Sequence, residues 1–216
     1  MATKRPISAA TTAPSCPVFT RILDAARRHF ISMGVNRITM DDLAGELGMS
    51  KKTLYAHFPG KEALIAHLME RKIAEVREGM HAIADDLDAP FADRVHRMAT
   101  FIVRQTSEIS PVFLRDLERH HPALFARIEA VRAEILPEVW GKVLASGAEQ
   151  GLVRAELDPR FLSEMMLTTL QQMLRPAVLD RLELPPHEII DRMLTILFNG
   201  ILTPAGRKAY EKGPSR

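Results

Sequence analysis

The chain has 216 residues, of which 46% are hydrophobic and 26% charged, and its formal net charge is +2. This composition excludes a disordered or fibrous protein, and the length allows one domain or a small domain joined to a larger one. The charge is divided unevenly, because residues 1–60 hold eight Lys/Arg against four Asp/Glu whereas the remainder holds 21 against 23. A positive excess in the first part is what phosphate neutralisation requires.

Residues 1–18 are rich in Ala, Thr, Ser and Pro and show no helical period, so we expect a flexible arm. Lys4 and Arg5 would suit a DNA minor groove, but a plain leader explains them as well. Cys16 is the single cysteine, which excludes an intramolecular disulfide and favours a reducing compartment. There is no membrane-spanning apolar run and no secretory signal. We therefore expect a cytoplasmic protein without membrane contact.

The first predicted helix covers residues 20–33. Ile22, Ala26 and Phe30 form an apolar stripe along it, and Gly34 supplies a permissive residue at its end. The stripe gives the elements that follow a surface to pack on.

Two short helices are predicted next, separated by a tight turn. Thr39 and Asp42 have the spacing of a capping box, so a helix begins at about Met40 and ends at Gly48. Ser50 is the N-cap of the second helix and leaves free backbone N–H groups that can bind a phosphate. This is the helix-turn-helix arrangement, in which the second helix enters the major groove of DNA.

The outward face of the second short helix carries the chemistry that a reader of duplex DNA needs. Leu54 and Phe58 bury its inner face. Lys51 and Lys52 can bind phosphate or guanine acceptors, and Thr53 can contact a thymine methyl. A solvated, lysine-bearing helix of an ordinary helical protein would show the same spacing.

A longer stretch, residues 21–68, carries a family resemblance. ILDAARRHF, a Gly34-containing turn and ITMDDLAGELGMSKKTLYAHFPGKEAL together resemble the N-terminal domain of the TetR-type (tetracycline-repressor-like) transcriptional regulators. The family often has a small residue where this chain has Lys52. The resemblance implies a set of DNA contacts in which Thr39 anchors a phosphate, Lys51, Lys52 and Thr53 face bases or backbone, and Tyr55, His57 and Lys61 hold phosphates.

After Pro59 the apolar pattern predicts a long helix to about Met80, and later helices are delimited by Pro and Gly. Predicted starts are Asp88–Pro90, Ser110–Pro111, Pro122, Asp158–Pro159 and Pro185–Pro186, with a kink or break at Pro137. No segment alternates with period two, so the fold class is all-α. We expect an arm at 1–18, a DNA-binding domain at 19–76, an effector-binding and dimerisation domain at 77–205 and a tail at 206–216.

No pattern in the chain points to catalysis. His120 and His121 are adjacent rather than one turn apart, and no His/Asp/Glu set has the spacing of a zinc helix. Motifs of serine hydrolases and of nucleotide-binding enzymes are missing. We expect no enzyme activity, no cofactor and no metal.

The last two predicted helices carry wide apolar stripes that would close a four-helix bundle with a second copy, as members of the resembled family do. The predicted interface residues are Met165, Thr169, Ile190, Met193, Leu194, Leu197, Phe198 and Ile201. A homodimer would place two recognition helices on a palindromic operator. The alternative is that both stripes belong to the chain's own core.

Large apolar residues in the second part are candidates for the wall of a ligand pocket. They are Met98, Phe101, Phe113, Leu117, Phe125, Trp140, Met166 and Met173. The resemblance implies a small apolar or aromatic effector that releases a repressor from its operator, although plain core packing would use the same residues. A DNA-binding regulator or architectural protein without effector, and an enzyme or scaffold that retains the helix-turn-helix, are the other hypotheses.

Overall fold

The computed structural model of the chain describes residues 17–212, and these residues form helices and no strand. The all-α prediction is confirmed. The helices in chain order are α1 (Pro17–Met33), the 3-10 turn η1 (Val35–Arg37), α2 (Met40–Glu46), α3 (Lys51–His57), α4 (Lys61–Ala84), α5 (Phe91–Ser107), α6 (Pro111–His120), α7 (Pro122–Glu149), α8 (Pro159–Met173), α9 (Pro176–Leu182), α10 (Pro186–Ile201) and α11 (Pro204–Glu211). None of these described helices is long and apolar enough to cross a membrane.

The two chain ends differ from the predicted arm and tail where the structure describes them. Pro17 and Val18 already belong to α1, while residues 1–16, including Cys16, lie outside the described residues. The predicted tail from residue 206 falls largely within α11, whose N-cap is Thr203. Thr203 followed by Pro204 is the same start pattern as Ser110 followed by Pro111, so the sequence contained this signal.

Most predicted helix starts agree with the structure, but Pro137 does not break its helix. The Ser110 hydroxyl accepts from the Phe113 N–H, and the Asp158 carboxylate accepts from the Arg160 N–H. α7 continues through Pro137 for 28 residues. A proline removes one helical hydrogen bond, and here the helix persists because its neighbours on both sides are buried against α4, α5 and α8.

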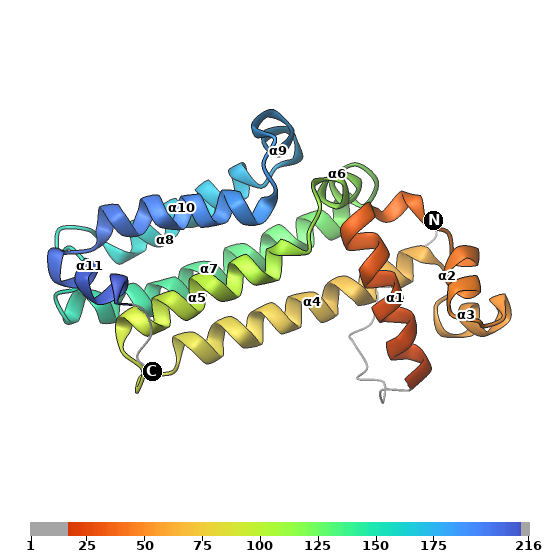
Figure 1. Ribbon diagram of the computed structural model, residues 1–216, viewed down its shortest axis with the longest axis horizontal. Coiled ribbons are helices and arrows are strands. Elements are labelled where there is room, and N and C mark those ends of the chain that lie inside the picture. The colour runs from red at the N-terminus through yellow and green to blue at the C-terminus, as the bar shows by residue number, and fades with distance from the viewer. Residues whose placement is uncertain (1–16, 213–216) are drawn as a thin grey trace, which may run out of the picture.

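The hydrophobic interior is divided into two clusters, and α4 runs through both (Figure 1). The first, which we name the head core, is formed by α1, η1, α2, α3, the first half of α4, and Phe113 and Leu117 of α6. The second, the body core, is formed mainly by α5, α7, α8 and α10 with the end of α4. Leu64 and Leu68 of α4 lie in the head core, whereas Met80 and Ile83 lie in the body core. One continuous helix therefore joins the helix-turn-helix to the rest of the molecule.

Candidate DNA interface and ligand cavity

The helix-turn-helix is built as its sequence pattern predicts, and it lies at one end of the molecule (Figure 1). The Thr39 hydroxyl accepts from the Asp42 N–H at 3.1 Å, and the Asp42 carboxylate accepts from the Thr39 N–H at 2.8 Å. Gly48 adopts φ +62° in the turn, a conformation that favours glycine. The Ser50 hydroxyl then accepts from the Thr53 N–H at 3.1 Å and starts α3.

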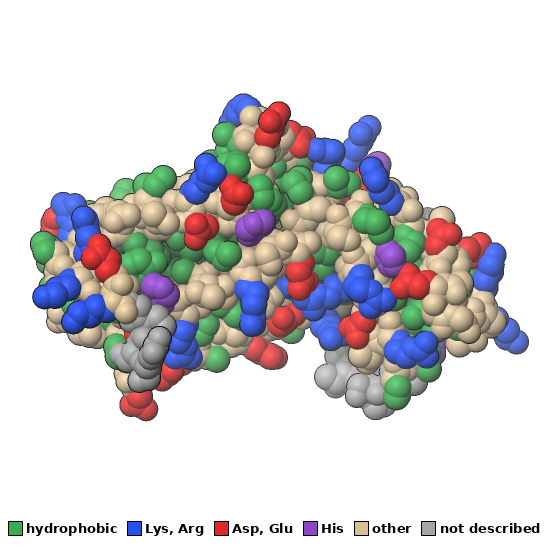
Figure 2. Space-filling model, in the orientation of Figure 1, with side chains coloured by type: hydrophobic (Ala, Val, Ile, Leu, Met, Phe, Trp, Pro, Cys, Tyr) green, Lys and Arg blue, Asp and Glu red, His purple; other side chains and the backbone are tan. Residues whose placement is uncertain are grey.

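Contacts between helices fix the direction in which α3 projects. Leu54 and Phe58 are fully buried in the head core, and the Phe58 ring stacks on the Phe19 ring of α1 with centroids 4.8 Å apart. This packing leaves the opposite face of α3 open to solvent. Figure 2 shows lysine and arginine side chains projecting at the end of the molecule that carries α3.

The predicted DNA-contact residues lie on the exposed side of α3 or at its edges. Ser50, Lys51, Lys52 and Thr53 are exposed, and so is Tyr55, with 46% of its surface accessible. Thr39 is exposed at the start of α2, and His57 is half-buried at the end of α3. Ser50, Lys51, Lys52 and Thr53 thus lie together at the N-terminal end of α3, whereas His57 lies at its C-terminal end.

The two α3 lysines differ in their electrostatic surroundings. The Lys51 ammonium lies 2.5 Å from the Asp41 carboxylate of α2, and this hydrogen bond raises the pKa of Lys51. Lys52 forms no ion pair or hydrogen bond with any of the residues that the structure describes. Lys52 thus carries a charge that no neighbouring carboxylate among the described residues compensates, whereas the charge of Lys51 is partly neutralised by Asp41.

Lys61 is set back from this surface at the start of α4. Its ammonium lies 5.7 Å from the centre of the Phe30 ring, and the residue is half-buried. Burial lowers the pKa of Lys61, against the opposing effect of the carboxylates of Asp116 and Asp42. Lys61 is therefore partly buried, as is His57, whereas Thr39 and Tyr55 are exposed.

A clamp formed by Glu46, Arg28 and His29 holds α2 against α1. The Glu46 carboxylate accepts from the Arg28 guanidinium at 2.9 Å and lies 2.5 Å from the His29 ring nitrogen. The hydrogen bonds from His29 and Arg28 lower the pKa of Glu46. The partners are 17 and 18 residues apart, so no local spacing in the sequence indicates this contact.

A mostly apolar cavity of about 140 Å³ lies where the head core meets the body core. It is lined by residues of α4, α5, α6 and α7, together with Ile31 of α1 and residues of α8 and α10. Ile73 and Val76 line it from the middle of α4, between the parts of that helix that belong to the two cores. A bound molecule here would touch both parts of the protein.

The structure does not bring the eight predicted pocket residues together. Phe101 and Phe113 line the cavity, but the others pack elsewhere. Met98 and Trp140 are buried in the body core, Leu117 is buried in the head core with Phe125 packed against it, and Met166 and Met173 line a groove between α8 and α10. Periodicity identifies which side of a helix is buried, but not which buried residues of different helices enclose a space.

The predicted interface residues also fall into two groups, one buried in the chain's own core and one beside the α8–α10 groove. Ile190, Leu194, Leu197, Phe198 and Ile201 are buried in the chain's own core. Met165 is exposed, and Thr169 and Met193 are half-buried beside the α8–α10 groove. The wide stripe of α10 exists because this helix packs inward on α5. Most of the inner part of the stripe is therefore used by the chain's own core, and of these five residues only Leu197 also lines the α8–α10 groove.

Two further apolar residues, one on α8 and one on α10, are exposed and were not predicted as interface residues. Ile196 is 75% exposed and Phe161 is 63% exposed. Ile196 lines the α8–α10 groove together with Met165 and Leu182, and Figure 2 shows hydrophobic side chains along the edge of the molecule formed by α8, α9 and α10. An exposed isoleucine one residue before the buried Leu197 lies outside the main stripe, so the periodic pattern hid it.

Nothing in the described residues resembles a metal site. No group of three or more His, Cys, Asp or Glu side chains within residues 17–212 is arranged to hold a metal ion. His120 is exposed, whereas His121 is buried and its ring nitrogen lies 2.9 Å from the Glu62 carboxylate. This pair links the start of α4 to the α6–α7 junction.

Comparison with known proteins identifies the fold and matches the helix-turn-helix region to one family. Residues 22–68 match the family of bacterial regulatory proteins called tetR. The chain is 26% identical over 166 residues to the HTH-type transcriptional regulator YvaF of Bacillus subtilis, covering 76% of this chain and 85% of that protein. It is 21% identical over 192 residues to the HTH-type transcriptional repressor DhaR of a Mycobacterium species, and this match covers 86% of this chain and 93% of that protein.

The fold also matches a solved structure over most of its length. A putative transcriptional regulator from Saccharomonospora viridis, solved in complex with choline, superposes with a TM-score of 0.66 at 18% identity and covers 87% of this chain and 98% of that one. The sequence relatives are transcriptional regulators and not enzymes. Residues 22–68, which include the helix-turn-helix, therefore match the DNA-binding domain of the tetR family of bacterial regulatory proteins, and the chain is a DNA-binding transcriptional regulator.

Proposed function

We propose that this protein is a dimeric repressor that leaves a palindromic operator when a small molecule enters the cavity between the two cores. The observation that carries the proposal is the position of the cavity, which is lined by the α4 segment joining the helix-turn-helix to the body core. The proposed units are a DNA-binding domain at residues 19–76 and an effector-binding and dimerisation domain at 77–205. The expected location is the cytoplasm.

The proposed DNA contacts follow from the exposed side chains around α3. Lys52, Thr53 and Lys51 would approach bases or backbone in the major groove, with Thr39, Ser50, Tyr55, His57 and Lys61 on phosphates. Phosphate contacts position the helix, whereas base contacts select the sequence. The unpaired Lys52 is the residue in this set best able to select guanine.

The proposed dimer interface is the outer face of α8 and α10, with a second copy as its occupant. Ile196, Phe161 and Met165 expose apolar surface there, and monomeric proteins rarely expose large contiguous apolar patches. Pairing of this face with its symmetry mate would bury the α8–α10 groove. Two recognition helices could then occupy half-sites one DNA turn, about 34–36 Å, apart.

Coupling between cavity and DNA would pass through α4 and α6. Phe113 and Leu114 of α6 line the cavity, and the same helix is joined to the head at two points. The Ser110 N–H donates to the Ile31 carbonyl at 3.0 Å, and the Asn36 N–H donates to the Asp116 carboxylate at 3.1 Å. A ligand that displaces α6 would shift α1 and η1, and with them the position of α3.

Operator selection tests the proposal. Purified protein would be used to select duplexes from a random pool, and affinity for the selected sequence would be measured over a salt series. We expect a palindrome, a dimer by sedimentation, and an affinity that falls log-linearly with salt concentration. Failure to select any sequence, or affinity independent of salt, would contradict a sequence-specific regulator.

Ligand response is tested separately with Val76→Phe, a substitution that fills part of the cavity. We expect this variant to bind the selected operator but to be insensitive to any small molecule that releases the wild type. Coupling of the usual size would weaken wild-type operator binding by roughly 5- to 150-fold. If Val76→Phe still responds, the cavity is not the effector site.

A further inference from the structure

The cavity is apolar except for a few side chains, and two of these form one polar corner. Lys72 of α4 and Gln105 of α5 both line it, and the Lys72 ammonium donates to the Gln105 side-chain oxygen. Thr106 lies next to Gln105, and its hydroxyl donates to carbonyls within α5. Arg132 reaches the wall from α7, where it pairs with Glu129. Both charged side chains that line the cavity are therefore cations.

Lys72 differs from Arg132 because its direct partner is neutral. Lys72 belongs to no ion pair among the described residues, since the amide of Gln105 stands between it and the Glu75 carboxylate. Burial and the neighbouring Arg27 charge lower the pKa of Lys72, while Glu75 acts in the opposite direction. A half-buried cation without a directly bound carboxylate is costly. An anion supplied from the cavity would relieve this cost.

The size of the cavity limits what that anion can be. An engineered cavity of about 150 Å³ lined by apolar residues accepts benzene, and the present cavity has about 140 Å³. One ring or a short branched chain fills this space. A cationic ligand would be repelled by Lys72 and Arg132.

We propose that the effector is a small, largely apolar carboxylic acid whose carboxylate binds Lys72 and the Gln105 amide while its ring or chain fills the apolar part of the cavity. This inference rests on the proposed function and specifies the chemical class of its ligand. Charge-assisted hydrogen bonds of this kind are stronger than neutral ones. An anionic ligand is expected because the charged side chains that line the cavity, Lys72 and Arg132, are both cations.

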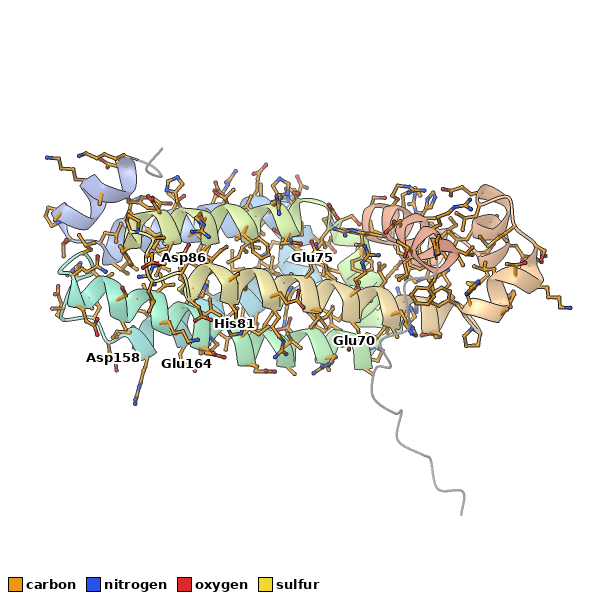
Figure 3. All side chains as sticks on the ribbon, turned by 90° about the horizontal axis from the view of Figure 1, so that it is seen from below. Glu70, Glu75, His81, Asp86, Asp158 and Glu164 are labelled. Atoms are coloured by element: carbon orange, nitrogen blue, oxygen red, sulfur yellow. The ribbon has the colours of Figure 1, made fainter. Side chains whose placement is uncertain are left out.

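The same corner also explains how an acid would affect the helix-turn-helix. Glu75 lies on the side of α4 that faces α5, as Figure 3 shows, and accepts from Gln105 at 3.0 Å. Arg27 of α1 lies 3.6 Å from Glu75 and 2.7 Å from Glu108. A carboxylate on Lys72 would add a negative charge beside this chain of contacts and compete for Arg27. The anchor of α1 to α4 and α5 would then loosen.

Calorimetry with three matched compounds tests the inference on the full chain. Phenylacetate, 2-phenylacetamide and 2-phenylethylamine share a ring and differ in charge. We expect phenylacetate to bind about tenfold tighter than the amide, and the amine to bind weakest. Lys72→Met should remove this preference, so that phenylacetate and the amide bind with about equal affinity. Lys142→Met, which changes an exposed lysine paired with Asp85, should leave the preference unchanged.

Each other outcome overturns the inference. Equal binding of acid and amide by the wild type, an unchanged preference in Lys72→Met, or no binding of any of the three compounds would each contradict an acid site at Lys72. If Lys72→Met does not fold, Lys72→Gln replaces it with the same expected loss of preference. Operator selection needs no ligand, so failure of the proposed function is distinguished from failure of this inference.

Discussion

The Lys51 ammonium of α3 lies 2.5 Å from the Asp41 carboxylate of α2, so the first cation of the recognition helix is neutralised by the helix before it. We expect Asp41→Asn to raise affinity for all duplex sequences, because Lys51 is then free to bind phosphate. One charge contact at a separation of about 4 Å in water corresponds to roughly a fivefold change in affinity. Fluorescence anisotropy over a salt series would measure the affinity, and the slope of log affinity against log salt concentration should be steeper by about one.

The matched control is Asp86→Asn, which breaks a similar pair with Arg97 at 2.6 Å in the body. This variant should bind DNA like the wild type. An equal rise in both variants would show that net charge alone, and not the release of Lys51, controls affinity.

Lys52 and Lys61 should affect DNA binding in different ways. Because Lys52 is unpaired on the exposed face of α3, Lys52→Ala should relax base preference at one position, at a cost of about 1–3 kcal/mol on the selected operator. Lys61→Ala should weaken binding to all DNA sequences to the same extent. It should also reduce the slope of log affinity against log salt concentration by roughly one. Competition binding against operators with single-base changes separates the two effects. Identical behaviour of both variants would mean that the roles are assigned wrongly.

The dimer proposal depends on the outer face of α10. Ile196→Glu should produce a monomer that binds the operator at least tenfold more weakly, because a charge is then placed in an apolar interface and two-site binding is lost. Analytical ultracentrifugation would measure the mass of each variant in solution and so distinguish monomer from dimer. Leu87→Glu is the control, since Leu87 is 78% exposed but lies between α4 and α5. A dimer that survives Ile196→Glu would place the interface elsewhere.

Gly34 joins α1 to η1 with φ +94° and ψ 159°, a conformation that is nearly exclusive to glycine. An added Cβ would lie 2.7 Å from the Val112 side chain and 2.8 Å from the Asp116 carboxylate of α6. We expect Gly34→Ala to lower the free energy of unfolding by about 1–3 kcal/mol, measured by thermal or urea denaturation. Gly45→Ala should stabilise slightly, by about 0.5–1 kcal/mol, because Gly45 is helical and faces open space. Equal stability of the two variants would disprove the strain at Gly34.

The Glu46 clamp should make stability depend on acid pH. The pKa of Glu46 is lowered in the folded state by hydrogen bonds from His29 and Arg28. Its contribution is therefore present above the ordinary glutamate pKa of 4.5 and is lost as pH falls through the lowered folded value. Glu46→Gln should lower the melting temperature at pH 7 by roughly 2–4 °C at most, since exposed pairs contribute up to about 1 kcal/mol.

The difference between wild type and Glu46→Gln should be smaller at pH 3 than at pH 7, because the wild-type carboxyl becomes protonated as the pH falls below 4.5 through the lowered folded pKa. Differential scanning calorimetry at the two pH values gives the comparison. A difference that is the same at pH 7 and at pH 3 would mean that the ion pair does not contribute.

The helix-turn-helix could be predicted from the sequence because its determinants are local. The Thr39–Asp42 capping box, the Ser50 N-cap and the turn at Gly48 each involve residues at most three or four positions apart. Such signals act within one turn of helix and do not depend on the rest of the fold. The same reason applies to Ser110 and Asp158, which cap α6 and α8 as predicted.

The cavity and the free apolar face could not be predicted in this way. Met98 and Phe101 lie on one helix, three residues apart, yet Met98 is in the body core and Phe101 lines the cavity. Ile190 and Ile196 lie on one helix as well, and only Ile196 is exposed. Both distinctions depend on how α4, α5, α7 and α10 are positioned against one another.

The sequence alone determined the helical class, the helix-turn-helix and the chemistry of its exposed face, since capping, turn formation and side-chain charge are properties of short segments. The tertiary structure decided that Lys51 is paired while Lys52 is free, that α7 passes through Pro137, and that Lys72 faces a cavity between two cores. These features join residues from about ten to several tens of positions apart, or depend on packing between helices. Their energies arise only when the helices come together, and no periodic pattern within one helix records them.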